Sequence, residues 1–254
     1  MSDSKSVIET LLANQNVSIN VATSFYGLPL TPLEMACARC LPETVRVLIN
    51  HGASVTGVKG MTPPIVFTVI FSNIKSTDVS TPAEARLVAD RPEDVTKVLD
   101  VLIEAGARVD QRDDSDGNTA LLTAVDIEDI DIVKRLVSHG ADVNIKNKAT
   151  ENALMLAAQS GNTDIADVLL QAGARLEDTN RDGWTPLFYA VAQNLSEFVQ
   201  FMIFNGANTL HKTQDGTPLT LGVKVYAEEV ARLLIKCESR QSLTSAILAA
   251  ADMN

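Results

Sequence analysis

Apolar residues along this chain recur at helical spacing in short segments, and polar turns separate the segments. Residues 180–211 illustrate the pattern. Leu187, Ala190 and Val191 have the i, i+3, i+4 spacing that predicts one amphipathic helix. After a short connection, a second group predicts a second helix: Phe198, Val199, Met202 and Ile203. The segment therefore predicts two helices that each bury one apolar face.

The ends of these two helices carry their own signals. Residues 180–183 (Asn-Arg-Asp-Gly) predict a turn, because Asn favours its first position and Gly tolerates a positive φ. Thr185 is predicted to cap the first helix with its hydroxyl, and Pro186 fits the first helical position, where a missing N–H costs nothing. Gly206 is predicted to end the second helix in the left-handed conformation.

These signals repeat along the chain. Gly-Ala pairs stand at five places: Gly52-Ala53, Gly106-Ala107, Gly140-Ala141, Gly173-Ala174 and Gly206-Ala207. The last three intervals are 34, 33 and 33 residues, and the first, of 54, is one period plus about 21 inserted residues. A second series keeps step with the first: Thr31-Pro32-Leu33, Thr62-Pro63, Thr119-Ala120-Leu121, Asn152-Ala153-Leu154, Thr185-Pro186-Leu187 and Thr217-Pro218-Leu219. A 33-residue period with this pattern resembles the ankyrin repeat.

The resemblance implies an all-α fold, an ankyrin-repeat solenoid of paired antiparallel helices with β-hairpin tips. One array over residues 1–254 is expected, made of a half repeat at 7–24, repeats at 25–56, 57–110, 111–146, 147–179, 180–211 and 212–238, and a C-terminal cap at 239–254. The helix of the cap is expected to begin near Ser242. An insertion, residues 72–91, interrupts the second repeat. In the first repeat, residues 26–30 (Tyr-Gly-Leu-Pro-Leu) replace the usual tip.

Composition narrows the function without naming it. The formal charge of the 254 residues is −11, so the surface would repel the phosphates of a nucleic acid, and a basic partner is favoured. No apolar run approaches the roughly 18 residues of a membrane-spanning helix, and no secretory signal is visible at the N-terminus. Three cysteines do not make a disulfide framework. We expect a monomer in a reducing cytoplasm.

Candidate chemical motifs have simpler structural explanations. Cys37 and Cys40 have CxxC spacing, but the period assigns Cys37 to a small core position, and no second CxxC exists. His51 and His139 stand at the same place two repeats apart, roughly 20 Å from each other at the usual helix spacing, which is too far to share a metal ion. The sequence has no phosphate-binding glycine loop and no recognisable Ser/His/Asp set. We therefore expect no enzyme, no cofactor and no metal site.

The resemblance implies that a partner binds to the hairpin tips and to the exposed ends of the first helices. Two features fall on that surface. Residues 110–131 hold eight acids and one base, Arg112, which gives them a net charge of −7. Trp184, the only tryptophan, stands beside Arg181 and Asp182, and Trp and Arg are frequent in binding hot spots. The candidate partner-binding residues are Asp114, Asp116, Asn118, Asp126, Ile127, Glu151, Gln159, Arg181, Asp182, Trp184 and Gln193.

Two functions remain open. The first is a non-catalytic scaffold or inhibitor that captures a basic protein through its concave face and hairpin tips. The alternative is a secreted bacterial or viral-type effector that mimics host adaptors and uses the 72–91 insertion as its main contact. Each surface feature also has a plainer interpretation, in which the acids form a solvated face and Trp184 packs against the neighbouring hairpin.

Overall fold

The computed structural model describes residues 18–25, 28–72 and 95–251. The chain divides into two compact units, Met1–Asp142 and Val143–Asn254, and each is described by itself. Most of the expected half repeat at 7–24 lies outside the described residues, as does nearly all of the insertion at 72–91. The described residues form twelve helices and one two-stranded sheet. The predicted all-α fold of paired helices is confirmed, and the repeat boundaries stay a prediction.

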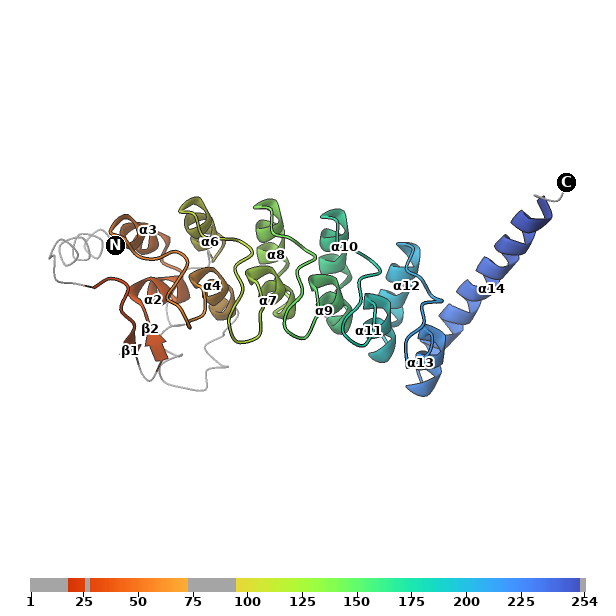
Figure 1. Ribbon diagram of the computed structural model, residues 1–254. Helices are drawn as coiled ribbons and strands as arrows, with labels where there is room; N and C mark the ends of the chain where they lie inside the picture. The colour runs from red at the N-terminus through yellow and green to blue at the C-terminus, as the bar shows by residue number, and fades with distance from the viewer. Residues whose placement is uncertain (1–17, 26–27, 73–94, 252–254) are drawn as a thin grey trace. The chain divides into compact units, whose positions relative to one another are not determined.

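The first unit contains a hairpin and three helix pairs. Its elements are β1 (Thr23–Phe25), β2 (Leu28–Leu30), α2 (Pro32–Ala38), α3 (Pro42–Asn50), α4 (Pro64–Ser72), α6 (Val95–Glu104), α7 (Ala120–Asp126) and α8 (Ile130–Ser138). The helices pair in chain order, α2 with α3, α4 with α6 and α7 with α8. The first helices of the pairs contact one another in a row, and so do the second helices, as Figure 1 shows for α3, α6 and α8.

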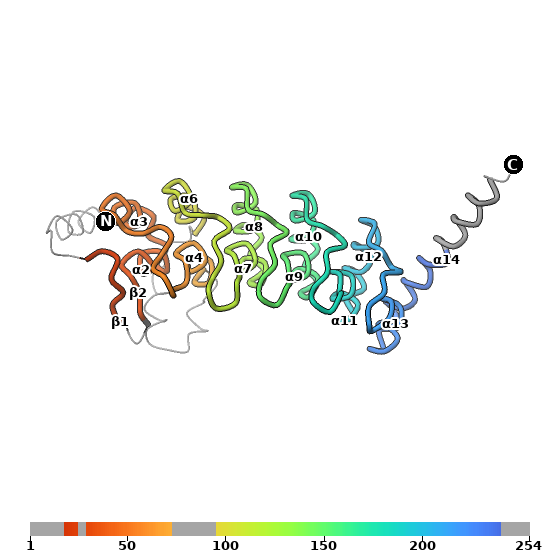
Figure 2. Tube along the Cα trace, in the orientation of Figure 1, coloured from red at the N-terminus to blue at the C-terminus, as the bar shows by residue number. Residues whose placement is uncertain are grey.

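The second unit repeats this plan. Its elements are α9 (Ala153–Ser160), α10 (Thr163–Gln171), α11 (Pro186–Ala192), α12 (Ser196–Phe204), α13 (Pro218–Lys224) and α14 (Glu228–Ala251). The pairs are α9 with α10, α11 with α12 and α13 with α14, and the first helices again form a row in which α11 contacts both α9 and α13. The tube in Figure 2 follows each first helix through a short turn into its partner.

Small residues let the first helices approach one another closely. The small position is buried in five of the six pairs: Ala36, Ala124, Ala157, Ala190 and Gly222. At the last of these, an added Cβ would lie 3.6 Å from a methyl of Val191, so a methyl group there would be in ordinary contact with the neighbouring first helix. The predicted role of these positions in core packing is confirmed.

The Gly-Ala pairs end the second helices by one recurring set of hydrogen bonds. After α12, the N–H of Gly206 donates to the carbonyl of Ile203 and that of Ala207 to the carbonyl of Met202, both at 3.0 Å. This is the Schellman arrangement, which requires a left-handed residue. Gly206 has a φ of +91°, while a Cβ there would meet no atom within 4 Å. Backbone conformation, rather than space, therefore requires glycine, and the predicted left-handed cap is confirmed.

Among the five first helices whose N-caps the structure describes, four begin with the predicted side-chain cap and one does not. The side chain of Asn152 accepts the N–H of Met155 at 3.0 Å, and threonines begin α2, α7 and α13 in the same way. At Thr185 the predicted cap is wrong, because its hydroxyl makes no cap hydrogen bond and is buried. The N–H of Phe188 donates instead to the Thr185 carbonyl at 2.9 Å. In this tighter turn the Phe188 N–H is already bonded to the Thr185 carbonyl, so it does not donate to the Thr185 hydroxyl.

The tips use side chains in place of extended strand pairing. Among the described residues only the first tip has two strands, with Thr23 opposite Leu30 and Phe25 opposite Leu28, so the strands are paired although the sequence departs from the usual tip. At the later tip the N–H of Asn180 donates to the carbonyl of Trp184 at 3.0 Å, and its side chain accepts the N–H of Trp184 at 2.9 Å. Because an Asn side chain can satisfy such amides, a short turn suffices.

The C-terminal end differs from the expectation of a separate cap helix near Ser242. Helix α14 runs without interruption from Glu228 to Ala251. The segment from Cys237 to Ser242 contains neither glycine nor proline, so nothing ends the helical hydrogen-bond pattern there. The hydroxyl of Ser239 donates to the carbonyl of Ile235, one turn earlier, at 2.8 Å.

Candidate protein-binding surface

The acids of residues 110–131 divide into structural acids and surface acids. Asp110 accepts the N–H of Asp142 at 3.0 Å. Asp113, only 6% exposed, accepts hydrogen bonds from the N–H and the hydroxyl of Ser115, each at 2.6 Å. Asp129 caps α8 by accepting two backbone N–H groups. These three carboxylates hold turns and helix ends together, so they contribute less to recognition than the count of eight suggests.

The surface acids include those that the sequence analysis selected at the tip. Asp114 and Asp116 are exposed, and Asn118 is half-buried. Both carboxylate oxygens of Asp116 accept hydrogen bonds from Asn118, one from its backbone and one from its side chain, at 2.8 Å each. The tip therefore presents its negative charge on a turn whose conformation is fixed.

Asp126 and Ile127 lie at the opposite end of α7 from this tip. Asp126 is exposed and is the last residue of the helix, and Ile127, its C-cap, is half-buried. Since α7 has seven residues, its two ends are roughly 10 Å apart. Glu128 then reverses the chain with a φ of +58°. The structure thus places acids at both ends of one short helix without joining them in a single cluster.

In the second unit, Glu151 belongs to a hydrogen-bonded group that the candidate residues did not include. The hydroxyl of Tyr189 donates to Oε1 of Glu151 at 2.8 Å and accepts from the side-chain amide of Asn180 at 2.9 Å. Burial, followed by the hydrogen bond to Glu151, raises the pKa of Tyr189 above its ordinary value. The group connects two tips and α11, so Glu151 has a structural role as well as a position on the surface.

Trp184 packs and also contacts the next tip. Its indole is half-buried, with Nε1 donating to a carboxylate oxygen of Asp215 at 3.0 Å. The ring centroid lies 5.7 Å from that of Tyr189 in an edge-to-face arrangement and 6.0 Å from that of Phe188. Both contacts are of the kind that stabilises aromatic clusters. The packing interpretation of Trp184 therefore has direct support, and the half-exposed ring remains accessible to a partner.

The remaining candidates of the second unit are exposed side chains on separate elements. Arg181 and Asp182 lie on the tip, where the backbone N–H of Arg181 donates to the hydroxyl of Thr150 at 2.7 Å. Gln159 and Gln193 lie at the C-terminal ends of α9 and α11. The structure brings Arg181 and Asp182 together at one tip, and it places the two glutamines at equivalent helix ends.

The hydrogen bonds between neighbouring tips were not predicted, although the repeat period indicates which tip residues are neighbours. Trp184 and Asp215 are 31 residues apart, and Arg181 and Thr150 are also 31 apart. One period therefore predicts which tip residues are neighbours. Tyr189 could have been found because a buried phenol needs a hydrogen-bond partner.

A second polar group connects the outer helices α6 and α8 of the first unit. Asp100 accepts hydrogen bonds from two guanidinium nitrogens of Arg135, with Nε at 2.6 Å, and lies 2.8 Å from Nε2 of His139. Its side chain is 17% exposed. The hydrogen bond from Arg135 is the main cause that lowers the pKa of Asp100 below its ordinary value. His139 thus has a carboxylate partner, and the described residues contain no group of three or more possible metal ligands.

The CxxC pair is part of the core. Cys37 is 0% and Cys40 1% exposed, and both are free thiols. Burial raises the pKa of the Cys37 thiol to about 12, so the reactive thiolate is scarce at neutral pH. The predicted core position of Cys37 is confirmed. His51, in turn, places Nδ1 2.8 Å from the carbonyl of Val47 on its own helix.

This burial predicts a simple labelling pattern. In the native protein, Ellman's reagent should react quickly with Cys237 alone, because it is half-buried whereas Cys37 and Cys40 are enclosed. All three thiols should react in denaturant. The variant Cys237→Ser should remove the fast phase. Rapid reaction of two thiols in the native state would show that the core around Cys37 and Cys40 opens to solvent.

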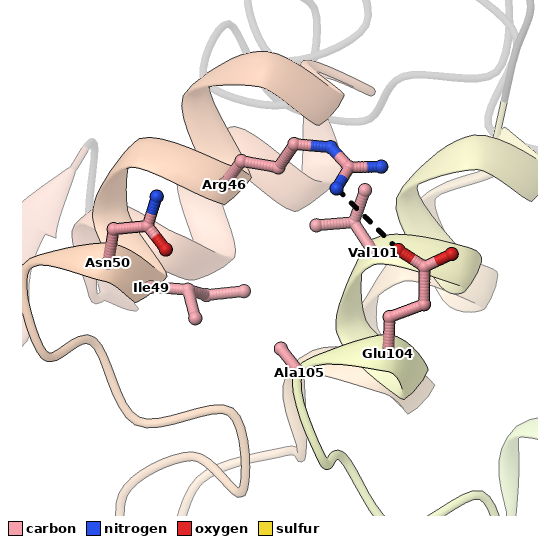
Figure 3. Close-up of a pocket in the computed structure, with 6 residues that line it drawn as sticks. All are labelled: Arg46, Ile49, Asn50, Val101, Glu104 and Ala105. Carbon is pink, nitrogen blue, oxygen red and sulfur yellow. Dashed lines mark ion pairs between the residues drawn. The ribbon is translucent and has the colours of Figure 1, made fainter.

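A shallow hollow lies between α3 and α6 on the outer row. Its volume is about 280 Å³, and Figure 3 shows Arg46 reaching toward Glu104 across it, with Ile49 and Ala105 along its sides. The two charged groups are 3.5 Å apart, and their side chains are 49% and 61% exposed. An ion pair as exposed as this one contributes at most about 1 kcal/mol. The hollow is therefore a gap between neighbouring outer helices that an exposed ion pair spans.

The described part of the chain contains no helix that is both long enough and apolar enough to cross a membrane. Together, the paired helices, the recurring Schellman ends and the turn-shaped tips define a helical repeat protein. The family model "Ankyrin repeats (3 copies)" matches residues 88–180 and 124–213. The chain is an ankyrin repeat protein.

Curated relatives cover different parts of the chain. It is 27% identical over 237 residues to the ankyrin repeat domain-containing protein SAT10 of Stachybotrys chartarum, which is 87% of this chain and 12% of that protein. It is 34% identical over 112 residues to the neurogenic locus notch homolog protein 1 of Danio rerio, 43% of this chain and 5% of that protein. A putative ankyrin repeat protein of Fowlpox virus, FPV031, is 34% identical over 108 residues, 41% of this chain and 32% of that protein. The chain thus spans less than a third of each relative.

A solved structure supports the fold. The ankyrin repeat domain from Acinetobacter baumannii AYE is similar with a TM-score of 0.67 and 22% identity, over 82% of this chain and 97% of that chain. At this identity the likeness concerns the fold alone. Because tips and helix ends vary freely among repeat proteins while the packing is kept, the fold does not specify a partner.

Proposed function

We propose that this protein is a non-catalytic scaffold or inhibitor that binds a basic protein through its tips and the exposed ends of its first helices. Ankyrin repeats imply protein–protein interaction, and the acidic segment supplies the preference for a basic partner. The further proposals are a monomer in isolation, a cytoplasmic location, and one array of six repeats with a half repeat before them and residues 239–254 as the cap.

The observation that carries the proposal is the exposure of Asp114, Asp116 and Asp126 on α7 and the tip before it. Asp110, Asp113 and Asp129 hold turns and helix ends together, whereas the side chains of Asp114, Asp116 and Asp126 are exposed to solvent. Exposed like charges near one another create a field that attracts a basic surface over a Debye length of about 8–10 Å. Such a field increases the association rate more than it strengthens the final complex.

The second unit would add contacts of another kind. Four polar side chains of this unit are exposed: Gln159, Arg181, Asp182 and Gln193. Trp184 is held by Asp215, so its half-exposed ring is already ordered before a partner arrives. An ordered aromatic ring loses little conformational entropy on binding, which suits it to be an anchor.

The proposal is tested by reversing the three surface acids. A chain with Asp114→Lys, Asp116→Lys and Asp126→Lys is compared with a control of equal net charge, in which exposed acids on outer helices are reversed: Asp167→Lys, Glu197→Lys and Glu229→Lys. Proteins captured from native extract by the wild type are purified and their association rates measured at several salt concentrations. We expect the first variant to associate at least about tenfold more slowly and to lose the salt dependence.

If the association rate fell equally in both variants, the net charge of the protein would explain the effect, and a docking site on this surface would be contradicted. An unchanged rate in the first variant would make the acids a solvated face. The alternative, an effector that binds through the insertion, concerns residues outside those described. Deleting residues 73–89 should abolish capture under that alternative and leave it intact under the proposal.

A further inference from the structure

One buried position of the repeat carries a carboxylate where four other repeats carry apolar side chains. Glu34 is the third residue after the helix-opening threonine in α2 and is 1% exposed. The equivalent third helical residues of four other first helices are apolar and buried to the same extent: Val66, Leu122, Met155 and Phe188. A carboxylate in such a place loses its hydration, so it is costly unless both oxygens find partners.

Only one oxygen of Glu34 has such a partner. Its Oε2 accepts the N–H of Thr31 at 2.8 Å, and its own N–H donates to the Thr31 hydroxyl at 3.2 Å, which completes a capping box. Its Oε1 is buried and accepts no hydrogen bond from the described residues. Burial accordingly raises the pKa of Glu34 above its ordinary value of 4.5. The capping box accounts for Oε2 of Glu34 and leaves the burial of Oε1 unexplained.

Glu34 lines a cavity in the first unit. The cavity has a volume of about 280 Å³ and opens between β2, α2, the chain around Met61 and α4. Its apolar wall includes Leu30, Phe67 and Phe71, and the two phenyl rings stack with their centroids 4.3 Å apart. A cavity of roughly 150 Å³ is enough for a benzene molecule, so this one has room for a side chain of a partner.

We propose that this cavity binds the side chain of a lysine from a bound polypeptide, with the ammonium group at Oε1 of Glu34 and the methylene stem along Phe67 and Phe71. An ammonium group supplies both the positive charge and the donor that this buried oxygen lacks. The four methylene groups of lysine match the apolar wall, and an ammonium group near a phenyl face gains a cation–π attraction. The site belongs to the N-terminal repeats and does not depend on the surface acids of residues 110–131.

The geometry favours lysine over arginine. A guanidinium group binds best when it pairs with both oxygens of a carboxylate. Here the N–H of Thr31 already occupies Oε2, so Glu34 offers one oxygen, which suits the compact ammonium group. A polypeptide is favoured over a free amine because one contact and a short stem bind weakly by themselves, and neighbouring residues of a partner add the rest.

Methyl signals of methionine provide a direct measurement. The full chain is labelled with ¹³C at its six methionine methyl groups, of which Met61 lines the cavity, whereas Met155 and Met202 are buried in the second unit and serve as internal references. The probes are n-butylammonium, its neutral counterpart 1-butanol, and two pentapeptides that differ only in lysine or norleucine at the centre. The comparison variant is Glu34→Gln, which keeps the shape and the capping acceptor and removes the charge.

In the wild type, n-butylammonium and the lysine peptide should shift the Met61 signal saturably while Met155 and Met202 stay unchanged. The lysine peptide should bind more tightly than its norleucine counterpart. Glu34→Gln should weaken n-butylammonium binding about tenfold or more and leave 1-butanol unaffected, with an unchanged melting temperature or a higher one as proof of folding.

Four results would overturn the proposal. The Met61 signal could fail to respond to either cation, or Glu34→Gln could bind n-butylammonium as tightly as the wild type does. A free amine that binds while the lysine peptide does not would assign the cavity to small amines. A response that appears only after residues 73–89 are deleted would assign it to that segment of the chain.

Discussion

Replacing Leu169 with alanine is expected to lower the free energy of unfolding by about 2–5 kcal/mol. Leu169 lies on α10 and is 0% exposed, so truncation leaves a cavity in a closely packed interior. In a repeat protein, packing passes only between neighbouring repeats. The loss should therefore concentrate in the unit Val143–Asn254. Urea unfolding followed by circular dichroism gives the total loss, and hydrogen exchange with peptide-level resolution gives its location.

The matched control is Leu136→Ala. Leu136 is also 0% exposed and stands four residues before Gly140, as Leu169 stands four before Gly173, so the two leucines occupy the same repeat position. We expect faster exchange in α10 and α12 for the first variant and in α6 and α8 for the second. If both variants lost protection equally along the whole chain, the protein would unfold as one cooperative body and the local interpretation would fail.

Most of the fold could be predicted from the 33-residue period, because each sequence signal of the period has a local structural cause. The Gly-Ala pairs predicted the ends of the second helices, since a left-handed residue is needed there whatever surrounds it. The small residues of the first helices predicted close packing for an equally local reason. These two signals depend on residues within a few positions of one another, so one sequence is enough to recognise them.

The errors occurred where two local rules compete or where a stop signal is missing. Thr185 satisfies the rule for an N-cap, but the carbonyl of the same residue takes the Phe188 amide. A separate cap helix was expected to begin near Ser242, although no residue between Cys237 and Ser242 interrupts α14. The hydrophobic pattern alone does not reveal which of two acceptors forms the hydrogen bond with a helix-start N–H, or where a helix ends.

The sequence predicted which residues lie on the candidate surface, but it did not predict the hydrogen bonds and packing contacts that these residues make. Exposure of Asp114, Asp116 and Asp126 follows from the register of the repeat. The hydrogen bonds of Tyr189 and Trp184 depend on side-chain directions in neighbouring tips, which the register brings close without orienting them. Glu34 was not singled out because a glutamate three residues after a threonine is the ordinary capping-box pattern. Only its burial distinguishes it.

Replacing Asp100 with asparagine is expected to lower the free energy of unfolding at neutral pH by about 1.5–3 kcal/mol. The carboxylate accepts two hydrogen bonds from Arg135 and lies within hydrogen-bond distance of His139, so it connects α6 to α8 across the outer row. Asparagine keeps the shape and loses the charge. The exposed pair of Arg46 and Glu104 is the matched control, because Glu104→Gln should cost no more than about 1 kcal/mol.

The pH dependence gives this prediction its sign. The folded pKa of Asp100 is lowered below its ordinary value of 3.8, so the unfolded chain binds the proton more readily than the folded protein does. The contribution of the carboxylate is therefore complete above pH 3.8 and is lost as the pH falls through the lower folded pKa. Urea unfolding of the wild type and Asp100→Asn should show a gap at pH 7 that narrows below about pH 3.8. A gap that stayed constant into acid would mean that packing of the residue, and not its charge, holds α6 to α8.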